Sequence, residues 1–196
     1  MKPFAESCEQ NKQVILGVLR ETFTGPGTVL EIGSGTGQHA VFFAEQLPHL
    51  QWQCSEQGKH LAGVNLWLED ANLENTLQPV ELDVTSSNWP AKTFDYIFTA
   101  NTLHILHWPM VEQMFAGIGN ILKTGGTFAV YGPFNYNGNY TSDSNARFDT
   151  WLKQRDPNSA IRHFEECNKL AIDAGLSLLA DHEMPANNRV LSWQKQ

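Results

Sequence analysis

The residues best suited to chemistry form a glycine-rich loop at positions 31–37, EIGSGTG. The loop follows a short apolar run and precedes a helical pattern, 38–47, that ends before a proline. Glycines have no Cβ, so they permit a tight turn and let a ligand lie against the backbone, while the helix offers unpaired N–H groups. This context predicts a nucleoside-type cofactor site that includes Glu31, Gly33, Ser34, Gly35 and Gly37.

Two acids follow later strand-like segments and fit the rest of such a cofactor. Glu56 comes just after the alternating segment 50–55, where a carboxylate can accept both hydroxyl protons of a ribose. Asp83 ends the segment 80–84 and is placed for an adenine amino group. Since the carboxyl ends of parallel strands share one edge, we expect the loop and both acids to line one crevice. A loop for an amino-acid part and acids for ribose and adenine describe a site for S-adenosylmethionine.

The acceptor chemistry is expected after the segment 94–99, where the sequence reads Asn101-Thr-Leu-His104-Ile-Leu-His107. A histidine with an ordinary pKa of about 6.5 can take a proton from an acceptor. It can equally cap the helix expected over 108–122. We choose His104 as the catalytic candidate ahead of His107. His39 is interpreted as a packed or exposed side chain.

A loop rich in aromatic and amide groups follows the segment 127–131, whose last residue, Tyr131, is the second catalytic candidate. This loop is expected to overhang the same crevice, where its side chains either enclose a planar acceptor or pack on the sheet edge. The stretch 141–162 carries mixed charge, typical of a solvated helix face, or of a lid that clamps an anionic acceptor. The substrate-binding candidates are Phe134, Asn135, Tyr136 and Arg155.

The elements that position these residues alternate between strand and helix along one domain, 1–196, which predicts a parallel α/β sheet. Ser7 and Gln10 have capping-box spacing ahead of a first helix. This alternation ends near the C-terminal part of the sequence, where a helix expected over 163–174 is followed by two strands, 176–183 and 189–193. Such closely joined strands must be antiparallel.

Composition excludes several classes of protein. The 196 residues carry a formal charge of −8, which argues against a broad cationic face for nucleic acid. The three cysteines stand apart, so we expect no disulfide framework and a reducing, cytosolic compartment. The opening residues lack the apolar core of a signal peptide, and no apolar run reaches the roughly 20 residues that span a bilayer. The histidines and cysteines lack zinc-ligand spacing, so no metal is predicted.

The sequence resembles the class I, Rossmann-like, S-adenosylmethionine-dependent methyltransferases over nearly its whole length. VLEIGSGTG is similar to their first motif, Glu56 to their ribose acid and Asp83-Val84 to their adenine-side motif. FDYI followed by Asn101 is similar to their fourth strand, and LKTGG to the turn before their fifth. More narrowly, the opening KPFAESCEQNK together with GSGTGQH resembles a small methyltransferase-like family of unassigned substrate.

The resemblance implies a doubly wound α/β fold with seven strands in the order 3-2-1-4-5-7-6, strand 7 being antiparallel. It also implies S-adenosylmethionine as cofactor, bound by the residues above together with Val84 and Asn101. The missing Asp/Asn-Pro-Pro-aromatic and Pro-Cys motifs argue against amino-methylating DNA and glutamine enzymes and against cytosine C5 chemistry. We expect a small-molecule acceptor. A non-enzymatic nucleoside-binding module stays open, as does a nicotinamide-dependent oxidoreductase, although its GxGxxG fingerprint is incomplete here.

Overall fold

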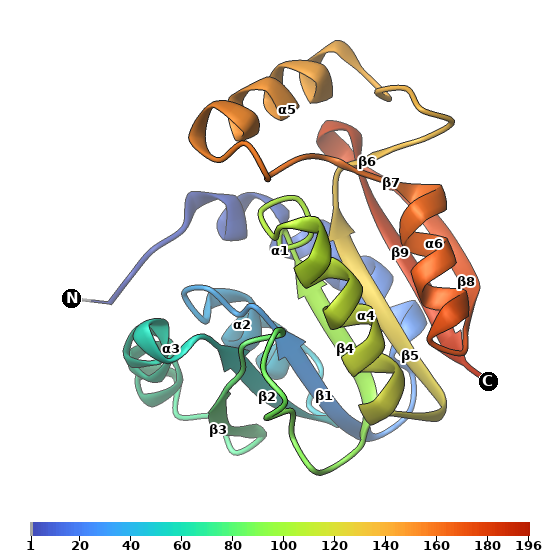
Figure 1. Cartoon of the computed structure of the whole chain (residues 1–196). Coiled ribbons are helices and arrows are strands. Elements are labelled where there is room, and N and C mark those ends of the chain that lie inside the picture. The colour runs from blue at the N-terminus through green and yellow to red at the C-terminus, as the bar shows by residue number, and fades with distance from the viewer. Residues whose placement is uncertain (1) are drawn as a thin grey trace.

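The computed structural model describes residues 2–196 and contains a central seven-stranded sheet (Figure 1). The sheet order is β3-β2-β1-β4-β5-β9-β8, and β9 runs antiparallel to both of its neighbours. The predicted order is confirmed, with β8 and β9 as the sixth and seventh strands of the sheet. The strands are β1 (Gly27–Ile32), β2 (Leu50–Glu56), β3 (Thr76–Glu81), β4 (Phe94–Ala100), β5 (Leu122–Gly132), β8 (Leu176–Met184) and β9 (Asn188–Lys195). A separate parallel pair joins β6 (Phe134–Asn135) to β7 (Arg162–His163).

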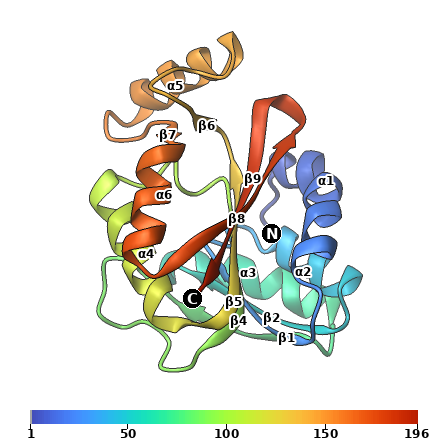
Figure 2. The same ribbon diagram turned by 90° about the vertical axis from the view of Figure 1, so that its right-hand side faces the viewer.

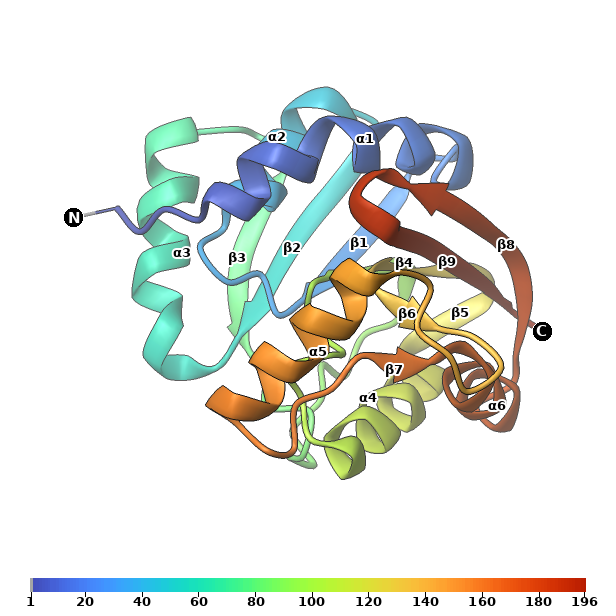
Figure 3. The ribbon, with the colours of Figure 1, turned by 90° about the horizontal axis from the view of Figure 1, so that it is seen from above.

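Helices cover both faces of the sheet, as the view from above shows (Figure 3). One face is covered by α1 (Glu6–Thr22), α2 (Gln38–Gln46) and α3 (Gly58–Ala71), and the other by α4 (Trp108–Ile121) and α6 (Phe164–Asp173). Helix α5 (Asp143–Arg155) lies instead across the edge where the parallel strands end (Figures 1 and 2). A short 3₁₀ turn, Pro185–Asn187, connects β8 to β9.

The core consists of two apolar layers, one on each side of the sheet. In β1, Val29 packs with the layer under α1 and α2, whereas the next residue, Leu30, packs with the layer under α4 and α6. Successive residues of a strand point to opposite faces, so a strand covered on both sides must be apolar throughout. This is why the segment 28–32 is mostly apolar, with Glu31 as its one charged residue. The strand ends are thereby fixed at one edge of the sheet.

Two local expectations were wrong. The capping box does not form, because α1 begins at Glu6 with Ala5 as its N-cap, and no side chain caps it. The third strand covers Thr76–Glu81 rather than 80–84, because its register is set by pairing with β2, which ends at Glu56. Asp83 therefore lies beyond the strand, in the turn that follows it.

Candidate functional site

A cavity of about 1040 Å³ opens at the edge where the parallel strands end; we call it the edge cavity. Its walls come from the glycine loop, the end of β2, the start of α3, the loop between β4 and α4, and the segment before α1. Its volume is at the upper end of the range for small-molecule sites, roughly 300–1,000 Å³. The sequence-predicted residues that line it are Gly33, Ser34, Gly35, Glu56, Val84 and Asn101.

The glycine loop turns sharply between β1 and α2. Gly33, Gly35 and Gly37 all have positive φ, at 71°, 58° and 91°, which residues with a Cβ rarely adopt. The backbone N–H groups of Gly33 and Ser34 both donate to the Ser55 carbonyl oxygen at 3.0 Å, so the loop is fastened to β2. A Cβ at Gly35 would meet no atom within 4 Å, which makes this glycine the open floor of the edge cavity.

The glycine loop and Glu56 meet directly, although they are far apart in the sequence. The Gly35 N–H donates to Oε2 of Glu56 at 2.8 Å, and the Gln57 N–H donates to Oε1 at 2.8 Å. Both carboxylate oxygens therefore lie beside the floor of the edge cavity. A carboxylate accepts more than one hydrogen bond per oxygen, so Glu56 retains the capacity to bind hydroxyl groups.

Three predicted cofactor residues, Glu31, Gly37 and Asp83, are not among the residues that line the edge cavity. Asp83 accepts bonds from the Thr85 N–H (2.9 Å) and hydroxyl (2.7 Å), and this turn places the neighbouring Val84 on the wall. Gly37 packs against α3, where a Cβ would lie 3.3 Å from the Val64 Cα. Glu31 is buried under the loop and accepts a bond from the Trp52 indole N–H at 3.1 Å.

Burial gives Glu31 an unusual pKa. Loss of hydration raises the pKa of this carboxyl from 4.5 to about 7; hydrogen bonds from Trp52 and Ser34 oppose the rise, and the negative charge of Glu56 adds to it. Between these pH values the folded protein holds more protons than the unfolded chain. Its free energy of unfolding should therefore fall as pH rises through this window and level off above pH 7.

We expect a Glu31→Gln variant to lose this pH dependence, because an amide at this position has no proton to release. The stability of the variant relative to the wild type should rise by up to roughly 2–3 kcal/mol from pH 5 to pH 8. Urea denaturation at several pH values measures the difference. The buried imidazoles of His39 and His104 titrate in both proteins and cancel in the comparison. A difference that stays constant with pH would contradict the raised pKa.

The two histidines after β4 lie in different surroundings. His104 is buried outside the edge cavity with its ring edge-on to Phe148; burial lowers the pKa of His104 to about 4, and the positive charge of Arg162 acts in the same direction. His107 instead lines the edge cavity and is 44% exposed. Its Nε2 lies 2.8 Å from Oδ2 of Asp156, which also lines the cavity. Sequence reasoning undervalued His107 and missed Asp156, because nothing in the sequence links positions 49 apart.

The second catalytic candidate and the acceptor-loop candidates are not among the residues that line the edge cavity. Tyr131 is buried with the layer under α1, and this burial raises the pKa of its hydroxyl. Phe134 and Asn135 are buried in β6, and the Asn135 carboxamide oxygen has no partner within residues 2–196.

The other two acceptor candidates, Tyr136 and Arg155, make their contacts outside the edge cavity. The Tyr136 hydroxyl donates to Asp181 at 2.9 Å, and its ring stacks on Phe164. The Arg155 guanidinium lies 4.6 Å from the centre of the Trp151 ring on α5. The structure therefore brings six of the nine cofactor candidates together in the edge cavity, but none of the acceptor candidates after β5.

Several residues of the edge cavity were not singled out from the sequence. Four belong to the segment before and at the start of α1, and the rest come from α3, the loop after β4 and α4: Pro3, Ala5, Ser7, Cys8, Lys59, His60, Leu66, Ile105, Leu106 and Met110. Two signals in the sequence could have indicated these residues: the apolar character of Leu66, Ile105, Leu106 and Met110, and the unusual opening sequence.

Residues 2–196 contain no cluster of three or more histidine, cysteine, aspartate or glutamate side chains with metal-binding geometry. None of its helices combines the length and apolarity required to cross a membrane. The three cysteines are free thiols, and burial raises the pKa of Cys8 to about 11 and of Cys167 to about 12.

Comparison with known proteins gives both a family and a fold. Residues 2–195 match the family described as "Protein of unknown function (DUF938)". "Sterol methyltransferase-like 3" of Botryococcus braunii is 24% identical over 180 residues, covering 85% of this chain and 43% of that protein. The chain thus spans less than half of this curated relative.

Solved methyltransferase structures superimpose on nearly the whole chain. An O-methyltransferase family protein from Burkholderia thailandensis has a TM-score of 0.85 at 15% identity and covers 97% of this chain and 58% of its own. Human N-acetylserotonin methyltransferase, solved in complex with SAM, has a TM-score of 0.79 at 16% identity and covers 97% and 53%. At this identity the likeness establishes a fold, and the fold agrees with the resemblance stated from the motifs.

Proposed function

Since the chain belongs to the DUF938 family of unknown function and has the class I methyltransferase fold, we propose that it transfers the methyl group of S-adenosylmethionine to a small acceptor. The observation that carries this proposal is the contact between Gly35 and Glu56 at the floor of the edge cavity. It unites a backbone surface that a ligand can approach with a carboxylate suited to paired hydroxyl groups.

In the proposed arrangement, the glycine loop holds the amino-acid part of the cofactor and Glu56 accepts hydrogen bonds from its ribose. Leu82 and Val84 line the wall beyond Glu56, where the adenine packs, and the bonds between Asp83 and Thr85 hold this wall in place. The fit is supported by the space above Gly35, where a Cβ would meet nothing.

The cofactor supplies a sulfonium methyl group that is already activated for transfer. The chain then has to hold the acceptor in line with the methyl group and exclude water. For a hydroxyl or amine acceptor it also has to take a proton. His107 is suited to this step, because Asp156 accepts from its Nε2–H and so leaves Nδ1 free to accept the acceptor's proton.

The walls near His107 favour an apolar acceptor. Leu66 and Ile105 both line the edge cavity and are 40% and 54% exposed, so large apolar side chains lie at its mouth. Leu106 and Met110 extend this surface inward. The net charge of −8 argues against a polyanionic acceptor. The Botryococcus relative is named for sterol methyl transfer, and sterols are apolar acceptors.

The cofactor assignment is tested by titrating S-adenosylhomocysteine into the wild type and a Glu56→Ala variant by calorimetry. Wild-type binding is expected, and the variant should bind roughly 10- to 100-fold more weakly, because hydrogen bonds to a charged acceptor are lost. A Glu74→Ala variant removes an exposed glutamate away from the edge cavity and should bind like the wild type. Equal affinities in all three proteins would remove Glu56 from the site, and no binding by the wild type would reject the cofactor.

A further inference from the structure

The segment before α1, together with the first residues of that helix, forms one wall of the edge cavity; we call residues 2–8 the strap. Pro3, Ala5, Ser7 and Cys8 line the cavity, whereas Phe4 points away and is 61% exposed. The view from above shows this segment running from the side of α3 toward α1 (Figure 3). The strap is therefore part of the same enclosure as the glycine loop and Glu56.

One end of the strap is fastened to α3. The Trp67 indole N–H donates to the Pro3 carbonyl oxygen at 2.6 Å. Lys2 forms an ion pair with Asp70, and its ammonium lies 3.9 Å from the centre of the Trp67 ring. At Gly63 a Cβ would lie 2.8 Å from Pro3 Cγ, so the close approach of strap and helix needs a residue without a side chain. Helix α3 begins just after Glu56.

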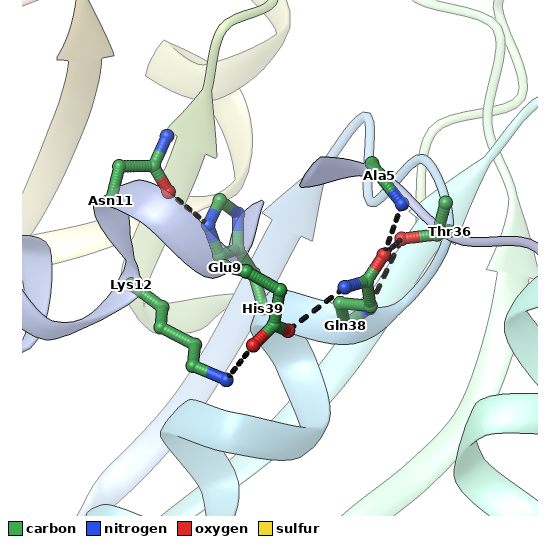
Figure 4. A network of polar contacts seen from close by, with 7 residues as sticks. All are labelled: Ala5, Glu9, Asn11, Lys12, Thr36, Gln38 and His39. Atoms are coloured by element: carbon green, nitrogen blue, oxygen red, sulfur yellow. Dashed lines mark hydrogen bonds and ion pairs between the residues drawn. The ribbon is translucent and has the colours of Figure 1, made fainter. Parts of the chain in front are cut away.

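The other end of the strap is fastened by Gln38, the first residue of α2 (Figure 4). Its Oε1 accepts from the Ala5 N–H at 2.5 Å and from the Thr36 hydroxyl at 3.0 Å. Its Nε2 donates to Oε1 of Glu9 at 2.9 Å, and Glu9 also pairs with Lys12. The Gln38 side chain is buried, so these protein groups are its partners in place of water.

A second contact joins the same two helices. Nε2 of His39 lies 2.7 Å from Oδ1 of Asn11 (Figure 4). The two motifs that together carry the narrower resemblance, KPFAESCEQNK and GSGTGQH, meet in the structure through the pairs Gln38–Glu9 and His39–Asn11. Their joint occurrence in this sequence has a physical basis in one polar network beside the glycine loop.

We propose that the strap completes the binding site for the cofactor and that Gln38 is the positioning residue that couples the strap to the glycine loop. This inference rests on the proposed function. One carboxamide oxygen accepts hydrogen bonds from both the Thr36 hydroxyl in the loop and the Ala5 N–H in the strap. The position of the strap is therefore coupled to the position of the glycine loop. A ligand that contacts both then binds more tightly to the docked strap, and in turn stabilises docking.

A swap of the Gln38–Glu9 pair tests the coupling. Gln38→Glu places a second carboxylate opposite Glu9, across a contact that now spans 2.9 Å, and should weaken S-adenosylhomocysteine binding about tenfold or more. The double variant Gln38→Glu, Glu9→Gln restores a donor and an acceptor and should return within about threefold of the wild type. Glu9→Gln alone keeps an oxygen that can accept from Gln38 and should also stay within about threefold. Calorimetry on the four full-length proteins measures these affinities.

Hydrogen exchange supplies a readout that general destabilisation would not give. Exchange of the backbone amides in residues 2–10 should slow on adding S-adenosylhomocysteine in the wild type and in the double variant, but not in Gln38→Glu. Failure of the double variant to recover affinity would overturn Gln38 as the coupling residue. Four equal affinities would overturn the inference and leave the proposed function standing. No binding by the wild type would overturn both.

A second variant keeps the test available if Gln38→Glu does not fold. Trp67→Phe removes the N–H that binds the Pro3 carbonyl and keeps an aromatic ring; it should weaken S-adenosylhomocysteine binding severalfold and speed amide exchange in residues 2–5. The matched control is Trp151→Phe on α5, where the indole N–H makes no hydrogen bond within residues 2–196. Equal effects of the two substitutions on affinity would argue against the strap.

Discussion

A Gly35→Arg variant is expected to lose S-adenosylhomocysteine affinity by about a hundredfold or more, the largest effect expected on binding. A side chain at this position would project from the floor into the edge cavity, because no other group occupies that space. An arginine would fill the volume that the proposed cofactor needs, and it would clash with any ligand seated on the loop. Calorimetric titration measures the loss.

The control for this variant is Gly138→Arg. Gly138 also has a positive φ, 75°, and a Cβ there would likewise meet nothing within 4 Å, but it does not line the edge cavity. Both substitutions carry a backbone strain of roughly 1 kcal/mol, so the pair separates strain from occlusion. Thermal unfolding should shift to a similar extent in both, whereas binding should fail in Gly35→Arg alone. Undiminished binding by Gly35→Arg would refute the placement of the cofactor.

A His107→Ala variant is expected to lose the methyl-transfer rate by roughly 10²- to 10⁴-fold with a hydroxyl or amine acceptor, while S-adenosylhomocysteine affinity stays within about threefold. The imidazole lies beside Asp156 in the wall of the edge cavity and is the group suited to take the acceptor's proton. Transfer of isotopically labelled methyl groups to a pool of small apolar hydroxyl and amine compounds provides the measurement.

Two further variants serve as comparisons for His107→Ala. Asp156→Asn keeps a hydrogen-bonding group but removes the negative charge, so the rate should fall less than in His107→Ala. His182→Ala, in β8 and away from the edge cavity, should leave the rate unchanged. A full rate in His107→Ala would overturn the assignment of His107 as the group that takes the acceptor's proton. Tight cofactor binding without transfer to any compound would favour a non-enzymatic binding module.

The cofactor side was predictable because its signals are local. The run from β1 through the glycine loop into α2 needs only adjacent residues. The mostly apolar strand that precedes the loop indicates that helices cover both of its faces. The third strand was misplaced because Val80 and Val84 look like strand residues, whereas pairing with β2 decided where β3 begins and ends. Register across a sheet is a tertiary property and leaves no periodic mark in one segment.

The acceptor side was less predictable for a related reason. His104 and His107 have the same chemistry and lie three residues apart, and only packing decides that one is buried and the other lines the edge cavity. Tyr131 was chosen because it ends a strand, yet alternation along β5 turns it toward α1. The strap was visible only as an unusual opening sequence, because its contacts are with α2 and α3.

The insertion of β9 between β5 and β8 has a consequence for the order of events during biosynthesis. One edge of β5 pairs with β4, and its other edge pairs with β9 (Asn188–Lys195). The second pairing cannot form until residues 133–187 and then β9 have left the ribosome. Until then Phe128 and Val130 lie on a strand with an open edge, a template for pairing with other nascent chains. Chaperone contact with β5 is therefore most valuable in the interval between the synthesis of β5 and the synthesis of β9.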